Sequence, residues 1–222
     1  MKIKWMGLAS FLITSDSGVR IINDPYEPGT DPHGYGHELL YGRITDSADI
    51  VTVSHEHWDH NKVETVKGSP RVLRQPGETD IKGIKIKGVA SLHDDVGGKK
   101  RGSNTIFCLE LDGVKVCHLG DLGHQLSKEQ LEDIGSVDVL LAPVGGVFTI
   151  DAKTATELAS LLKAKIIIPM HYRHDKCNFP VAEVDEFLTD KENVIHPDAT
   201  EIELHKENLP KSPAVVVMKA AC

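Results

Sequence analysis

The chain has 222 residues, of which 40% are hydrophobic and 26% are charged, a balance that excludes a disordered or membrane-embedded chain. Its formal net charge of −8 opposes non-specific binding to nucleic acid. The apolar stretch from Trp5 to Ile13 is interrupted by Gly7 and Ser10 and is too short to cross a bilayer. No small-residue cleavage site follows it, so it predicts a strand, and the expected location is the cytoplasm.

The first third of the chain is predicted to be rich in strands. Apolar, β-branched runs predict strands at residues 2–6, 10–14, 19–23 and 50–53. A polar segment rich in Gly, Pro and His fills residues 25 to about 47. It is predicted to be a surface loop, and the alternative is that His33, Tyr35 and His37 line the mouth of a cleft. A short helix is expected from about Asn61 to Lys67.

The remaining two thirds mix strands with helices. Strands are predicted at 84–90, 105–111 and 114–119, and Asp112-Gly113 favours a tight hairpin between the last two. Ser127-Lys128-Glu129-Gln130 indicates a capping box that opens a helix. Strands at 137–142, 166–170 and 214–218 then alternate with helices at 151–162 and 181–188. No repeat or linker interrupts this order, so we expect one α/β domain over residues 1–222, with sheets packed between helices.

The most informative motif is His55-Glu56-His57-Trp58-Asp59-His60, which directly follows the apolar strand at 50–53. In an extended segment, residues two apart point to the same side, so His55, His57 and Asp59 can converge. A turn at Asp59-His60 lets a fourth group approach. Imidazole and carboxylate ligands suit zinc, iron or manganese, so this segment predicts a metal site, with Trp58 packed beneath it.

A polar residue ends an apolar strand at three further places, namely His93, Asp121 and His171. Taken singly, each of these residues is more typical of a cap or a surface position. Their order and kind are informative only together with the motif at 55–60.

This ligand series resembles that of the metallo-β-lactamase superfamily. The segments His118-Leu119-Gly120-Asp121-Leu122-Gly123-His124 and Pro169-Met170-His171-Tyr172 resemble one branch of it more narrowly. That branch comprises stand-alone metal-dependent hydrolases of largely unassigned substrate, related to ascorbate-phosphate lactonases. The resemblance implies a four-layer αβ/βα sandwich in which two mixed sheets are flanked by helices.

The resemblance also implies how the ligands are shared between two divalent ions, with zinc expected and manganese or iron as alternatives. Asp121 would bridge the two ions, and Asp24, at the end of an early strand, would accept a hydrogen bond from a ligand histidine. A turn aspartate before Pro25 is the alternative for Asp24. His93 follows His60 closely for this superfamily. The first ion would be held by His55, His57 and His93, and the second by Asp59, His60 and His171.

Such a site predicts hydrolysis of a small ester, phosphoester or lactone. Two divalent ions, set against two carboxylates and one shared hydroxide, leave about one positive charge, which favours an anionic substrate. Asp59 and His124 are the candidate catalytic residues, His124 because it follows Asp121 by three residues. The candidate substrate contacts are Lys99, Lys100, Arg101, Asn104 and Arg173. A solvated basic loop is the alternative for residues 99–101.

Three other functions are weighed against hydrolysis. A di-iron redox protein of this superfamily would carry Glu in place of His57 and an added flavin-binding domain. A nucleic-acid-processing enzyme would carry an inserted domain and a basic surface, so no nucleic-acid partner is expected. A metal-binding or partner-binding protein without turnover is the alternative from a different class. Membrane partners are not expected, and self-association is left open.

Overall fold

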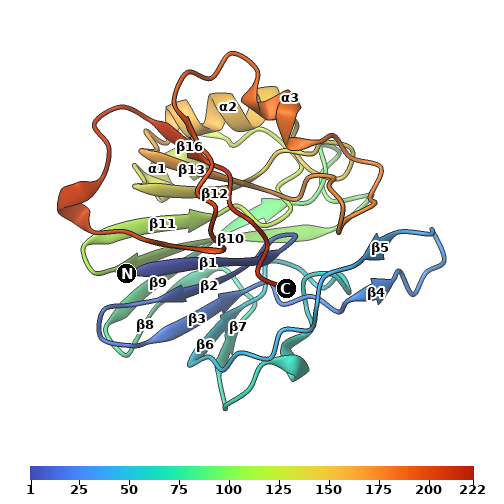
Figure 1. Ribbon diagram of the computed structural model, residues 1–222, viewed down its shortest axis with the longest axis horizontal. Coiled ribbons are helices and arrows are strands. Elements are labelled where there is room, and N and C mark those ends of the chain that lie inside the picture. Colours follow the sequence, from blue (N-terminus) through green and yellow to red (C-terminus); the bar gives the residue numbers. More distant parts are fainter.

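The computed structural model describes residues 1–222 and contains two large mixed β-sheets that face each other (Figure 1). The six-stranded sheet has the order β15 (Glu201–Glu203), β1 (Lys2–Gly7), β2 (Ser10–Thr14), β3 (Arg20–Asn23), β6 (Ile50–Thr52) and β7 (Arg71–Leu73). The eight-stranded sheet has the order β14 (Val194–Ile195), β16 (Ala214–Val216), β13 (Ile166–Met170), β12 (Val139–Pro143), β11 (Val114–His118), β10 (Ser103–Leu111), β9 (Ile84–Leu92) and β8 (Gly77–Ile81). A separate two-stranded hairpin, β4 (Gly29–Thr30) and β5 (Glu38–Leu39), projects from one side.

The α-helices are few and lie on the outer side of the eight-stranded sheet (Figure 1). They are α1 (Lys128–Ile134), which contacts β9, α2 (Ala152–Leu161), which contacts β12, and α3 (Val184–Leu188), which contacts α2. Two short 3-10 helices, η1 (Val63–Thr65) and η2 (Lys206–Asn208), complete the elements. None of the helices has the length and hydrophobicity that a membrane crossing would need. The predicted α/β sandwich of two mixed sheets is confirmed.

Local sequence signals account for several of these elements. Asp112 and Gly113 both have positive φ, 50° and 72°, as a two-residue turn between β10 and β11 requires. Ser127 caps α1 through the predicted capping box, with Gln130 as its partner. The side chain of Asp151 caps α2 by accepting a hydrogen bond from the Thr154 N–H.

Two helix predictions were too long. The predicted helix at 61–67 is only η1, because the N–H of Lys62 donates to Pro25 O and Lys67 pairs with the backbone at 46–48. The predicted helix at 181–188 begins only at Val184, because the N–H of Ala182 donates to Gly145 O. In both segments the backbone hydrogen bonds that a longer helix would use are made to neighbouring loops instead.

The core is one cluster of 61 buried hydrophobic residues, with members from both sheets. Strands β12 and β13 are buried along their whole length, as expected for parallel strands covered on both faces. Because the rigid core extends to the ends of β6, β9, β11 and β13, the loops that leave these strands start from fixed positions.

Candidate metal centre

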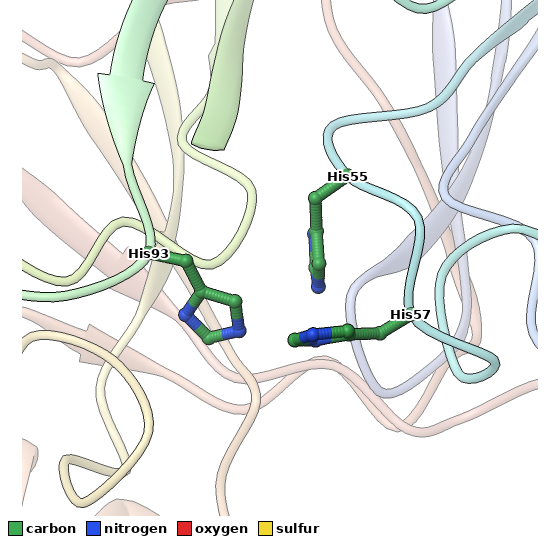
Figure 2. Close-up of side chains that lie close together, drawn as sticks. All are labelled: His55, His57 and His93. Atoms are coloured by element: carbon green, nitrogen blue, oxygen red, sulfur yellow. The ribbon is translucent and has the colours of Figure 1, made fainter. Parts of the chain in front are cut away.

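The ligand-type residues predicted from the sequence converge at one end of the two facing sheets. The segment 55–60 follows β6 of the six-stranded sheet. His93 follows β9, Asp121 lies three residues after β11, and His171 follows β13, all in the eight-stranded sheet. Figure 2 shows the rings of His55 and His57 from one loop meeting the ring of His93 from the other sheet. The centre therefore lies between the sheets and depends on both.

Asp121 lies at the middle of the cluster. Its Oδ2 lies 3.2 Å from Nε2 of His171, 3.3 Å from Nε2 of both His60 and His93, and 3.9 Å from Nε2 of His55. The side chains of all five residues are at least 97% buried. A buried carboxylate surrounded by four imidazoles is a costly arrangement unless protons or metal ions provide positive charge.

The donor atoms fall into compact groups whose members lie within 4.8 Å of one another. One group is His55, His57 and His93, and another is Asp59, His60 and His171. These two groups have the composition of the two ligand sets expected from the sequence. Asp24 joins a third group with His55 and His60.

Asp24 supports this cluster from behind. It accepts hydrogen bonds from the N–H and hydroxyl of Ser54, and its Oδ2 lies 3.0 Å from Nδ1 of His60. The Ser54 hydroxyl also lies 2.9 Å from Nδ1 of His55. Asp24 has a φ of 40°, a left-handed conformation that aspartate tolerates better than most residues. The arrangement leaves Nε2 as the free nitrogen of both rings.

The unpaired atoms of the cluster fit a metal site. Nε2 of His55, Nε2 of His60 and Oδ1 of Asp121 are buried without a hydrogen-bond partner. Buried polar atoms are seldom left unpaired in proteins, and a missing ion is one recognised reason. Imidazole nitrogen and carboxylate oxygen are donors that divalent zinc, manganese or iron accept. The residues present therefore suit divalent metal ions.

Ionisation in the metal-free protein supports the same conclusion. Burial, assisted by the neighbouring His60, holds the pKa of His55 well below its usual value, and burial lowers the pKa of His93 to about 4. Burial also disfavours charge on His60, but the carboxylates of Asp121 and Asp59 raise its pKa well above the usual value. The cluster thus keeps two neutral imidazoles ready to coordinate and gathers positive charge beside Asp121, where a metal ion would replace the proton.

Three glycines are required by close packing around the centre. A Cβ atom on Gly120 would collide with Ser54 and the Asn104 side chain, and one on Gly123 would collide with the main chain of His93 and Asp94. A Cβ on Gly145 would collide with the carbonyl oxygen of His171. The glycines of the segment 118–124 therefore let the loop that carries Asp121 lie directly against its neighbours.

The cluster opens into a cleft of about 350 Å³. Residues of the β4–β5 hairpin line its mouth, so the alternative considered for the early loop holds, and Trp58 also faces the cleft. Phe148 and Phe179 line it as well, although no sequence pattern singled them out. The lining residues are Asp31, His33, Tyr35, His37, His57, Trp58, Asp59, His93, Arg101, Asp121, Phe148, His171 and Phe179.

Only one residue of the basic loop lines the cleft. Arg101 is half-buried and lies over the ring of Phe148, 5.3 Å from its centroid, whereas Lys99 and Lys100 are exposed and do not line the cleft. The loop is shaped by Asp94, whose carboxylate accepts hydrogen bonds from four backbone N–H groups, those of residues 96, 98, 100 and 101.

Three other residues that were predicted to be catalytic or to contact substrate have other roles in the structure. Nε2 of His124 accepts a hydrogen bond from the Leu92 N–H and its Nδ1 contacts the carbonyl of Gln125, so neither nitrogen is free for catalysis. Asn104 is buried and its Oδ1 accepts from the N–H of Asp121, which orients that residue rather than a substrate. Arg173 pairs with Glu183 on the surface, outside the cleft.

Comparisons with known proteins identify the family of this chain. Residues 2–171 match the family described as the β-lactamase superfamily domain. A UPF0173 metal-dependent hydrolase of Thermococcus onnurineus is 30% identical over 197 residues, which are 78% of this chain and 84% of that protein. Another protein of that name, from Methanoregula boonei, is 31% identical over 200 residues, covering 78% of this chain and 82% of its own.

A solved structure covers almost the whole chain. It is that of a Thermotoga maritima protein named as a zinc-dependent hydrolase of the metallo-β-lactamase superfamily, with 42% identity and a TM-score of 0.77. The similarity covers 98% of this chain and 97% of that one. This chain therefore belongs to the metallo-β-lactamase superfamily and, within it, to the UPF0173 metal-dependent hydrolases.

Proposed function

We propose that the enzyme holds two divalent metal ions, zinc by preference, and hydrolyses a small anionic ester, phosphoester or lactone. The observation that carries the proposal is the position of Asp121, whose Oδ2 lies 3.2–3.9 Å from Nε2 of four histidines at the base of an open cleft. A carboxylate has two oxygens and can serve two ions, which a neutral imidazole cannot.

The compact groups support the proposed division of the ligands. His55, His57 and His93 would hold one ion, and Asp59, His60 and His171 the other, with Asp121 between them. The preponderance of imidazole among these donors favours zinc over magnesium or calcium. Two such ions, when bound, would polarise an ester or phosphoryl oxygen and make hydroxide available near neutral pH.

Other residues of the chain would orient a ligand histidine and bind the substrate. Asp24 would hold His60 in the tautomer whose Nε2 faces the centre. Arg101 makes no ion pair and faces the cleft, so its guanidinium would bind the carboxylate or phosphate of the substrate. No serine or cysteine lines the cleft, which argues against a covalent intermediate on the protein.

The test is to measure bound metal by elemental analysis in protein purified without chelator, and then to screen substrates. Metal-free protein would be reloaded with zinc, manganese or iron and assayed with phosphodiesters, phosphomonoesters, carboxylic esters and lactones. We expect about two ions per chain and turnover of an anionic ester that chelation abolishes. Activity that survives complete chelation, or a reloaded protein that binds two ions and hydrolyses none of these classes, would overturn the proposal.

A further inference from the structure

One wall of the cleft is built from aromatic rings that come from three separate loops. His37 directly precedes β5 in the β4–β5 hairpin, Phe148 lies in the loop after β12, and Phe179 lies in the loop after β13. The His37 ring centroid lies 5.1 Å from that of Phe179 and 5.6 Å from that of Phe148, and the two phenylalanine centroids are 6.2 Å apart. We call these three rings the aromatic wall.

The aromatic wall connects the metal centre with the one arginine of the cleft. At one end, the ring of Phe179 packs against the ring of His171 with a centroid distance of 5.9 Å. At the other end, the guanidinium of Arg101 lies 5.3 Å from the centroid of Phe148. A ligand that reached from the metal centre to Arg101 would therefore lie along the wall.

The backbone is bent to present Phe148 to the cleft. Gly146 and Val147 both have positive φ, 66° and 59°, and the Phe148 N–H donates to the carbonyl of Gly146. Valine rarely adopts this conformation because its β-branched side chain is crowded there. In this turn the side chain of Val147 is 62% exposed, whereas the ring of Phe148 lines the cleft.

Two more aromatic residues line the cleft with accessible surface. Trp58 is half-buried beside the ligand segment, and Tyr35, at the hairpin tip, is 77% exposed. Aromatic rings that stay accessible in a concave site offer edges and faces to another flat ring. The cleft therefore combines a metal centre, aromatic surfaces and a single guanidinium.

We propose that the substrate carries a flat, unsaturated ring next to the bond that is hydrolysed, and that the aromatic wall binds this ring while Arg101 binds the acidic group. The proposal deepens the function proposed above and rests on it for the reaction. The guanidinium of Arg101 lies over the Phe148 ring and makes no ion pair, so its N–H groups stay free for a carboxylate or phosphate. A saturated chain or ring would gain the apolar contact but not the preference of aromatic rings for one another.

A matched pair of ligands tests the flatness requirement without any turnover. Benzylphosphonic acid and cyclohexylmethylphosphonic acid share the same acidic head and linker and differ only in the ring. Binding to the metal-loaded protein would be followed by tryptophan fluorescence, since Trp58 lines the cleft, and confirmed by calorimetry. We expect the benzyl compound to bind roughly three- to tenfold more tightly, the range that one aromatic pair supplies.

Three variants assign the preference to the wall. Phe148→Leu keeps an apolar side chain at this half-buried position and should bring the affinity ratio close to one. Phe148→Tyr, which retains the ring, should keep the ratio. Arg101→Gln should weaken both ligands by a similar factor. Thermal melting of each variant would show that the fold is kept.

Equal affinities for the two phosphonates in the wild type, or a ratio that survives in Phe148→Leu, would overturn the aromatic wall as a recognition surface. The outcome is separable from that of the proposed function. Ester hydrolysis without a ring preference would refute the wall alone. A ring preference in a protein that hydrolyses no ester would refute the reaction and leave the wall standing.

Discussion

Nδ1 of His60 lies 3.0 Å from Oδ2 of Asp24, and both side chains are completely buried. Because the same carboxylate accepts from the N–H and hydroxyl of Ser54, and that hydroxyl also contacts His55, one aspartate orients two rings of the centre. The first prediction follows from this arrangement. Asp24→Asn should weaken metal binding by about 10–100-fold while leaving the ligand residues in place.

Competition of the Asp24→Asn protein with a chromogenic chelator would measure the affinity. The control is Asp185→Asn, which removes an exposed carboxylate of α3 that does not line the cleft. Affinity that is unchanged in Asp24→Asn would mean that His60 and His55 need no support from this carboxylate.

The second prediction concerns how the ligands are shared. Asp121→Ala should reduce the content of both metal ions, because Oδ2 of Asp121 lies near four imidazoles at once. His93→Ala should reduce the content of one ion, because His93 belongs to a single compact group. Elemental analysis of the two variants beside the wild type gives the stoichiometries. Full metal content in Asp121→Ala would refute its bridging role.

The third prediction separates Arg101 from the lysines that precede it. Arg101→Gln should raise KM for an anionic substrate roughly tenfold at low salt, because a charge-assisted hydrogen bond is lost. The double variant Lys99→Gln/Lys100→Gln should stay within about twofold of the wild type, because screening leaves little attraction from exposed charges outside the cleft. Steady-state kinetics at two salt concentrations measures both, and a larger effect from the lysines would show that the loop closes differently around substrate.

The fourth prediction concerns Gly123, whose missing side chain leaves space for the main chain of His93. Gly123→Ala should lower the free energy of unfolding by about 1–3 kcal/mol, as overpacking does, and should reduce metal retention because His93 is displaced. Gly42→Ala is the matched control, since its added Cβ would meet its nearest atoms at 3.7 Å, an ordinary contact. Denaturant unfolding and elemental analysis measure the two effects, and equal behaviour of the two variants would contradict the prediction.

The fifth prediction is a pH dependence of the metal-free protein. Burial lowers the pKa of His93 to about 4 from a usual value of 6.5, so between these values the unfolded chain binds more protons than the folded one. The free energy of unfolding should therefore rise as pH increases from about 4 to 6.5. His60 opposes this little, since its raised pKa keeps it protonated in the folded state throughout the window.

His93→Gln removes that titration and should flatten the slope. The shift of His93 corresponds to at most about 3 kcal/mol across the window, and His55 adds in the same direction. Urea unfolding of chelated protein at several pH values tests this. A slope that is the same in wild type and His93→Gln would show that His93 is accessible to protons in the folded state.

The part of the site that lies at strand ends could be predicted from the sequence. A run such as Ile166–Met170 marks a buried strand, and the polar residue that follows it lies at the end of that strand, so the position of His171 could be predicted from the pattern alone. Asp121 could be placed within a few residues of the end of β11. The ligand segment 55–60 was informative for the same reason. The resemblance to a known ligand order then supplied what strand ends alone could not.

The part that depends on contacts between loops could not be predicted. His93 directly follows an apolar strand and His124 lies in the loop after another. Only the hydrogen bond from the Leu92 N–H to Nε2 of His124 holds His124 away from the cleft. Phe148 and Phe179 lie in irregular segments with no periodic pattern, and their meeting with His37 depends on the placement of the β4–β5 hairpin. Nothing in the sequence around Asn104 indicates which residue it contacts, and its hydrogen bond with Asp121 is seen only in the structure.

Because the ligand-type residues come from both sheets, the metal centre can be completed only late in the synthesis of the chain. The segment at 55–60 leaves the ribosome early, but the carboxylate of Asp121 and the ring of His171 follow much later, and β13, which positions His171, pairs with β16 near the C-terminus. A growing chain therefore carries the imidazoles of residues 55–60 before Asp121 and the second sheet are present to hold them in place. Ions captured at that stage would be bound weakly and would exchange, so we expect the geometry of the finished fold, rather than the first ion that the nascent chain meets, to select the metal.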